Sequence, residues 1–462
     1  MQKFLKFLEP AGKYLIAAVL IIVPLFPKFP LFPVPGTYVA IRFEDILLLL
    51  LGILTAIKIL SDIKGFFADE IVQAFLIFFA AGFVSLLGGV FLTKNVTLLI
   101  GFLNWARRIE YVVPFFAGLT LLAKEKVSEN LQFYIKILLI DVFIIFIYGF
   151  GQRYFNFPII ITQNEEYSKG IALRYTPGTQ LNSTFAGHYD LAAFIVLTLP
   201  VFLSLLFIFK DKLSRVFLSL ASAAGFWLLV STISRISQVA YLVAVGIAFF
   251  IVKRFKALAV ILVISVALMV MSGNLDARFQ RVIDVFYQKF NISKITSVIK
   301  EKFVVDAQTL TIPANPHAFA TPVPTPIPVF EDRSTSIRLN VEWPRAIRAF
   351  LKDPIIGTGY SSIDLATDND YLRMLGETGL LGFLAFFLIF ARIAKLFLEK
   401  AFPLTEKFSG IELGFMAGII GSVAGTFIIA TFIDIFEASK FATIFWLLLG
   451  YAVYFLRNKN YA

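Results

Sequence analysis

Residues 71–93 read IVQAFLIFFAAGFVSLLGGVFLT and contain no charged side chain. A run of about 20 apolar residues is long enough to cross the roughly 30 Å hydrocarbon core of a bilayer as a helix. Similar runs recur along the chain, which has 462 residues, 58% of them hydrophobic and only 16% charged. The mean hydropathy is +0.82, whereas a typical soluble protein carries about 25% charged residues. We therefore predict an all-α polytopic membrane protein.

Twelve stretches have the length and apolar character of membrane spans. They are residues 12–27, 43–60, 71–93, 97–123, 130–150, 189–209, 213–231, 236–252, 255–272, 378–398, 409–433 and 438–456. The first resembles a signal peptide, but Pro residues follow it instead of a small-residue cleavage site, so we expect an uncleaved span. Cys is absent, which excludes a disulfide-stapled secreted scaffold. The whole chain, 1–462, is predicted to form a single membrane domain.

The distribution of Lys and Arg predicts the orientation of these spans, because cytoplasmic loops are enriched in basic residues. With the N-terminus inside, the inside segments and the span ends beside them hold 19 basic residues, and the five shorter outside segments, counted in the same way, hold 8. Both termini are therefore expected in the cytoplasm, with the chain in the inner membrane. This topology explains part of the net charge of +11, so the charge does not indicate nucleic acid. A basic outer surface also suits an anionic ligand.

Two predicted outer segments are large enough to carry function: 151–188, between spans 5 and 6, and 273–377, between spans 9 and 10. Within the second, 311–328 contains six Pro and no charged residue, a composition typical of an extended linker. A helix is expected to begin at Trp343, because Pro344 suits a first helical position. Its separate apolar and basic faces predict that it lies on the membrane surface.

Charged residues within spans are costly and tend to be paired or functional. Span 4 contains Arg107, Arg108 and Glu110, and Asp141 lies at a similar depth in span 5. These residues could form an ion-pair cluster that joins the two spans. They could instead form a cationic floor beneath a phosphate site.

Two polar segments near the predicted outer surface contain candidate site residues. Arg235 lies in the polar turn 231–238, where its guanidinium could bind phosphate in a bidentate manner or could anchor the helix at the interface. His188 follows a polar run and opens span 6, so it could act as an acid or base or could orient the helix start. The other His, His317, lies in the Pro-rich linker and is expected to be inert.

The segment 334–382 brings several acids to the entrance of span 10. Metal binding by Asp368, Asp370 and Glu377 is conceivable, because hard cations take oxygen ligands. The spacing is not that of a calcium loop, so we predict neither a metal nor another cofactor.

Three blocks of sequence resemble the O-antigen ligase and O-antigen polymerase superfamily of bacterial membrane proteins. The first runs from Arg174 through STFAGHYDLAAF at 183–194, and the second is the turn Ser234-Arg235. The third is Arg338…Trp343…Pro354-x-x-Gly357-x-Gly359…Asn369-x-Tyr371-Leu372…Glu377-x-Gly379-x-x-Gly382. The resemblance implies transfer of a glycan from an undecaprenyl-diphosphate carrier to an acceptor hydroxyl at the outer membrane face, without a metal.

The resemblance also implies roles for individual residues. Arg174 and Arg235 match Arg residues that bind the diphosphate, and Arg338 matches a further basic position. Asp368 stands where many ligases have the His that is their presumed base, so Asp368 is the first candidate base and His188 the second. Supporting positions are Asn369, Tyr371, Glu377, Arg107 and Arg108. The implied partners are the undecaprenyl-diphosphate-linked glycan, a glycan, lipid or protein acceptor, and membrane lipids.

The alternatives are a polymerase of the same superfamily and, from another class, a flippase or transporter of lipid-linked oligosaccharides. The replacement of His by Asp368 weakens the assignment as a ligase and leaves the polymerase open. A transporter would be expected to distribute charges through the bundle and to contain paired broken helices. The acid- and Gly-rich outer segment favours the transferase.

Overall fold

The computed structural model describes residues 2–26, 30–34, 40–121, 127–159, 173–176, 178–271, 337–363 and 366–458. A helix lies at each of the twelve predicted span positions within this part of the chain. The helices are α1 (Gln2–Leu25), α2 (Phe43–Leu60), α4 (Glu70–Leu87, continued by the π-helix η1, Gly88–Leu92), α5 (Leu98–Thr120), α6 (Val127–Tyr154), α8 (His188–Leu206), α9 (Lys212–Ser231), α10 (Arg235–Ile251), α11 (Phe255–Met271), α16 (Asp370–Ala401), α18 (Gly410–Ile429) and α19 (Ser439–Asn458).

The remaining elements are short. They are α3 (Ile63–Ala68), α15 (Trp343–Lys352), α17 (Leu404–Lys407), the π-helix η4 (Arg338–Glu342), the 3-10 helix η5 (Ile435–Glu437), and four strands: β1 (Pro30–Pro33), β2 (Ala40–Arg42), β3 (Pro158–Ile159) and β4 (Leu173–Arg174). The strands form two antiparallel pairs, β1 with β2 and β3 with β4. The predicted all-α fold class is confirmed.

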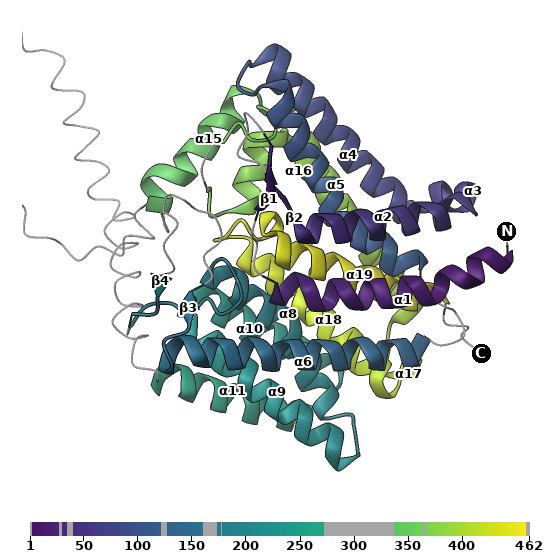
Figure 1. Cartoon of the computed structure of the whole chain (residues 1–462), viewed down its shortest axis with the longest axis vertical. Helices are drawn as coiled ribbons and strands as arrows, with labels where there is room; N and C mark the ends of the chain where they lie inside the picture. The colour runs from purple at the N-terminus through teal and green to yellow at the C-terminus, as the bar shows by residue number, and fades with distance from the viewer. Residues whose placement is uncertain are drawn as a thin grey trace, which may run out of the picture.

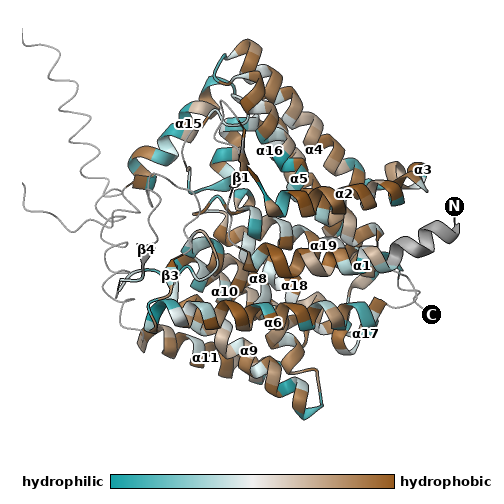
Figure 2. Cartoon of the chain, in the orientation of Figure 1, coloured by the Kyte–Doolittle hydropathy of each residue, from teal (hydrophilic) through white to brown (hydrophobic). Residues whose placement is uncertain are grey.

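The helices have the character of membrane spans, and the chain is a polytopic membrane protein. In the described residues, seven helices are long and apolar enough to cross a bilayer, and three shorter ones are also apolar. The charged residues of α2 and α5 set these two helices apart. Figure 2 shows that α2 and α4 consist mostly of hydrophobic residues and that α15 contains hydrophilic ones. The number of twelve crossings stays a prediction.

Small residues on α18 allow its neighbours to approach closely. A side chain at Gly418 would meet the backbone of Val201 on α8, and one at Gly421 would meet the carbonyl of Ala244 on α10. Helices in a bilayer gain stability from such close contact, because lipid supplies little hydrophobic driving force between them. The α8, α10 and α18 helices therefore form one tightly packed group. In the other part of the bundle, α19 packs against α5.

The two ends of the helix bundle form two distinct sides of the molecule (Figure 1). Both termini lie on one side, whereas α15, β3 and β4 lie on the opposite side. The elements β3, β4 and α15 belong to the segments 151–188 and 273–377, and the outer location of these segments stays a prediction. The linker 311–328 and His317 lie outside the described residues. The predicted helix at Trp343 is confirmed as α15, although its predicted apolar face is divided, with Ala346 buried and Leu351 66% exposed.

Candidate active site

The two glycine motifs of the segment 353–382 fit into one another. The α16 helix is interrupted at Gly379, which has φ of 62° and ψ of −169°, a conformation available essentially only to Gly. This break frees the carbonyl groups of Gly376 and Glu377, which accept hydrogen bonds from the backbone N–H groups of Thr358 and Gly359 at 3.0 and 2.9 Å. The loop that precedes α16 is therefore held to the helix by backbone hydrogen bonds.

The predicted supporting residues Asn369 and Tyr371 hold the start of α16. Asn369 caps the helix, since its Oδ1 accepts a hydrogen bond of 2.9 Å from the N–H of Leu372. Its Nδ2 donates to the carbonyl of Thr431 at 3.0 Å, and the hydroxyl of Tyr371 donates to the carbonyl of Phe427 at 2.7 Å. Both side chains thus tie α16 to the end of α18.

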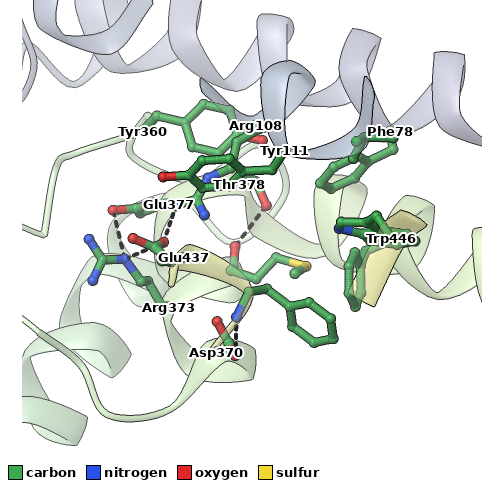
Figure 3. A pocket seen from close by; sticks show the side chains of 14 residues that line it. Phe78, Arg108, Tyr111, Tyr360, Asp370, Arg373, Glu377, Thr378, Glu437 and Trp446 are labelled. Atoms are coloured by element: carbon green, nitrogen blue, oxygen red, sulfur yellow. Dashed lines mark hydrogen bonds and ion pairs between the residues drawn. The ribbon is translucent and has the colours of Figure 1, made fainter. Parts of the chain in front are cut away.

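A network of buried charges lies beneath this junction (Figure 3). The guanidinium of Arg373 lies 2.8 Å from Glu437, 3.0 Å from Asp434 and 3.5 Å from Glu377. Arg108 of α5 also pairs with Glu437. Burial alone would raise the pKa of the Glu437 carboxyl, but Arg108 and Arg373 hold it below its usual value. The network joins α5 and α16 to the connector between α18 and α19.

The charged network borders a cavity of about 50 Å³. Phe78 and Trp446 form part of its apolar wall, opposite Arg373 and Glu377 (Figure 3). A cavity of this size can hold a few water molecules where polar groups are present to bind them. It is far too small for a glycan.

A second polar group, nearer the loop ends, brings three candidate residues together. The Nε and Nη2 atoms of Arg338 donate to Oδ2 of Asp368 at 2.9 and 2.6 Å. Nη2 also donates to the hydroxyl of Tyr189 at 3.1 Å, and the His188 and Tyr189 ring centroids are 3.9 Å apart. We call His188, Tyr189, Arg338 and Asp368 the arginine–aspartate site. Its members come from the start of α8, from η4 and from the loop before α16.

Burial and nearby charges shift the pKa values of Asp368 and of the neighbouring Glu342. Burial raises the pKa of the Asp368 carboxyl, and the Arg338 guanidinium opposes this shift. Glu342, at the end of η4, has its pKa raised to about 7, first by burial and then by the charge of Asp368. The charge of Asp368 thus acts on the Glu342 carboxyl beside one guanidinium.

The two diphosphate-binding candidates are only partly placed. Arg235 is the first residue of α10, and the preceding turn adjoins the segment before α8, because the carbonyl of Ser231 accepts a hydrogen bond of 3.1 Å from the N–H of Leu181. The backbone of Arg174 lies in β4, but its side chain is outside the described part of the structure. The joint action of Arg174, Arg235 and Arg338 stays a prediction.

The predicted pairing of spans 4 and 5 through Asp141 is wrong. Arg107 lies 3.9 Å from Asp45 of α2, and Arg108 pairs with Glu437. Asp141 is fully buried, and its oxygens accept no hydrogen bond from the described residues. The physical reason is the position of α5 within the bundle, because α5 packs mainly against α19 and α2. Equal depth in the bilayer does not make two helices neighbours.

Several side chains in or beside the polar clusters, and one buried cation, were not singled out from the sequence. They are Tyr189, Glu342, Arg373, Asp434, Glu437 and Lys440. Asp434 and Glu437 lie in a connector between two apolar spans, which was a usable signal of polar residues at the membrane surface. Lys440 is 1% exposed and donates to the carbonyls of Pro24 and Thr184 at 3.1 and 2.8 Å. Nothing in the spacing of the sequence indicated these partners.

The described residues contain no group of three or more His, Cys, Asp or Glu side chains that could hold a metal ion. That the reaction needs no metal stays a prediction.

Comparison with known families gives one match. The family described as O-Antigen ligase matches residues 220–387. This range includes Arg235, Arg338, Asp368 and Glu377, whereas His188 and Arg174 precede it. No curated protein matches the chain. The match agrees with the motifs of 334–382 and with the many apolar helices, and it supports a glycosyltransferase-like enzyme of polysaccharide biosynthesis that acts on lipid-linked glycans. Residues 220–387 of this multi-pass membrane protein are thus similar to the O-antigen ligase family, which supports the O-antigen ligase/polymerase superfamily.

Proposed function

We propose that the protein transfers a glycan from undecaprenyl diphosphate to an acceptor hydroxyl at the outer face of the inner membrane. The observation that carries this proposal is the arginine–aspartate site, where Arg338 joins Asp368 to Tyr189 beside His188. Its residues come from three segments, and η4, which carries Arg338, continues directly into α15. A donor could reach this level while its polyprenyl chain remains in the lipid.

The proposed reaction develops negative charge on its leaving group. The acceptor oxygen attacks the anomeric carbon, and the bond from that carbon to the diphosphate breaks with its electron pair. Preorganised Arg side chains can stabilise the departing diphosphate. We assign this role to Arg174 and Arg235, with Arg338 as a third cation. A base must take the proton of the acceptor hydroxyl, and Asp368 and His188 are the candidates from the sequence.

The proposed orientation places both termini in the cytoplasm. The 19 basic residues of the inside segments against 8 in the shorter outside segments support it. The grouping of the termini on one side, opposite α15, agrees with an even number of crossings. The arginine–aspartate site would then face outward, where an acceptor glycan, lipid or protein could approach it.

Ligase and polymerase differ in the acceptor, which is another molecule for a ligase and a further donor-linked glycan for a polymerase. Asp368 in place of the ligase His keeps the polymerase as the second candidate.

A reconstituted assay tests the proposal. Purified protein in liposomes would be supplied with an undecaprenyl-diphosphate-linked glycan and, in separate reactions, with lipid, glycan or protein acceptors. We expect glycan transfer to one acceptor class, with release of undecaprenyl diphosphate and no loss on adding a chelator. Arg338→Met should abolish transfer, whereas Lys407→Met, on α17 at the opposite side, should not. Movement of the donor across the bilayer without transfer would identify a flippase instead.

A further inference from the structure

Glu342 and Arg338 occupy the two ends of the π-helix η4. A spacing of four residues puts two side chains on the same helix face, and the wider i→i+5 turn of a π-helix preserves this relation. Single π turns are frequent at functional sites. The local backbone thus presents a carboxyl group beside the guanidinium of the arginine–aspartate site.

The Oε2 atom of Glu342 is buried, and it accepts no hydrogen bond from the described residues. The charged groups that act on it are Asp368, Arg338, Asp434 and Arg345. Each of these has another partner: Arg338 binds Asp368, and Nη2 of Arg345 donates to the carbonyl of Ala366 at 2.7 Å. Asp434 accepts hydrogen bonds from the N–H groups of Thr367 and Asn369.

A buried acceptor without a partner is costly and calls for an explanation. Asp368, which the sequence favoured as the base, differs from Glu342 because its carboxylate already has a hydrogen-bond partner. Its Oδ2 already accepts two hydrogen bonds from Arg338. A carboxylate held in this way is suited to fixing the guanidinium, and its proton affinity is reduced by the same contact.

We propose that Glu342 is a further catalytic residue and that its Oε2 takes the proton of the acceptor hydroxyl. This inference rests on the proposed glycan transfer. As the acceptor oxygen forms its bond to the anomeric carbon, the O–H bond breaks and its proton passes to the Glu342 carboxylate. The electrons of the breaking carbon–oxygen bond leave with the diphosphate. Asp368 serves as a positioning residue that holds Arg338.

The ionisation of Glu342 fits this role. Burial, followed by the charge of Asp368, raises its pKa to about 7, while Arg338 and Arg345 limit the shift. A general base works best when its pKa is close to the operating pH. Glu342 is therefore available both to accept a proton during transfer and to release it to solvent afterwards.

The experiment compares Glu342→Gln with the native protein in the reconstituted transfer assay between pH 5.5 and 9. The native rate should fall as the pH drops below about 7, because the base becomes protonated. Glu342→Gln should reduce kcat by about 10²–10⁴, the usual contribution of a general base, and should remove this acid limb. KM for the donor should stay within about twofold of the native value. Glu342→Asp should recover part of kcat.

A stability measurement separates catalysis from folding. The folded-state pKa of Glu342 is raised above its unfolded value, so its favourable contribution is present below about pH 4.5 and is lost as the pH rises through about 7. Glu342→Gln removes the buried charge and should melt no lower than the native protein at pH 8. Glu406→Gln, an exposed change on α17, is the matched control and should alter neither rate nor melting.

The outcomes distinguish the two proposals. If the native protein transfers glycan but Glu342→Gln keeps its rate and acid limb, the role of Glu342 is wrong. A fall in kcat accompanied by weaker donor binding and earlier melting would show that Glu342 is structural. Loss of the acid limb in Asp368→Asn alone would make Asp368 the base. If the native protein transfers no glycan to any acceptor, the proposed function fails, and this role of Glu342 fails with it.

Discussion

Two polar clusters lie close together in this membrane protein, and they differ in how their charges are matched. In the network around Arg373, one guanidinium faces three carboxylates, and a second cation, Arg108, completes it. In the arginine–aspartate site, Arg338 has one carboxylate and one phenol. In the first cluster, the charged groups pair with one another. The second holds a cation with fewer fixed partners, as the proposed binding of an anionic substrate requires.

The largest effect is expected from Arg373→Met, which would leave Glu377, Asp434 and Glu437 without their shared cation. Removing one member of a buried ion pair typically costs roughly 3–5 kcal/mol. Folded yield and thermal unfolding in detergent measure the loss. Arg392→Met, on the same helix, removes only an exposed pair with Glu70 and should cost about 0–1 kcal/mol. Equal melting of the two variants would erase the proposed distinction between the clusters.

The next effect concerns rate instead of stability. Arg235→Lys keeps the positive charge but loses the planar fork that binds phosphate oxygens in pairs. Glycan transfer should fall about 10²–10³-fold, as for one donor of a preorganised site, with normal folded yield. Arg254→Lys, in the exposed connector between α10 and α11, is the control and should transfer normally. Near-native transfer by Arg235→Lys would remove Arg235 from the diphosphate site.

A smaller effect is expected at Gly379, in the backbone that supports both clusters. Gly379→Ala forces a side chain into a left-handed conformation and against the carbonyl of Ile355. We expect a loss of about 1–3 kcal/mol, measured by thermal unfolding, together with reduced transfer. Gly246→Ala on α10 has open space and should be neutral or slightly stabilising. A neutral Gly379→Ala would show that the interrupted helix is not required.

The last test perturbs the protein least and asks on which side of the membrane the clusters lie. The chain has no Cys, so Lys212→Cys and Arg348→Cys can each be labelled alone in intact cells. Both positions are exposed. A reagent that cannot cross the membrane should label position 348 and not position 212. The reverse pattern would invert the orientation and place the arginine–aspartate site in the cytoplasm.

The sequence predicted the positions of the helices well and their neighbours poorly. Apolar length is a property of each segment alone, and it located all twelve helices, as at 71–93. The motif ending in Gly382 likewise predicted Asn369, Tyr371 and Glu377 as supporting residues, and each makes contacts at the start of α16. The pairing of Arg108 with Glu437 depends on which helices lie side by side. That information is absent from hydropathy, and for this reason the expected partner Asp141 was wrong.

The candidate site was predicted in part for the same reason. His188, Arg338 and Asp368 could be chosen because each lies in a polar segment next to a span. Tyr189 and Glu342 were missed, since a phenol at the start of a span and a single acid before Trp343 carry no signal by themselves. Tyr189 enters the site only through its contact with Arg338, which lies 149 residues away in the sequence.

The position of Asp434 has a consequence for synthesis of the protein. Its carboxylate accepts hydrogen bonds from the backbone N–H groups of Thr367 and Asn369. The loop that carries Asp368 is therefore held in place by a residue that follows α18. The α16 helix is synthesised before this connector, because α17 and α18 lie between them in the chain. The growing chain should therefore remain unable to act on donors already in the membrane until its last helices have been inserted. Activity would then appear at the end of assembly and not gradually with each new span.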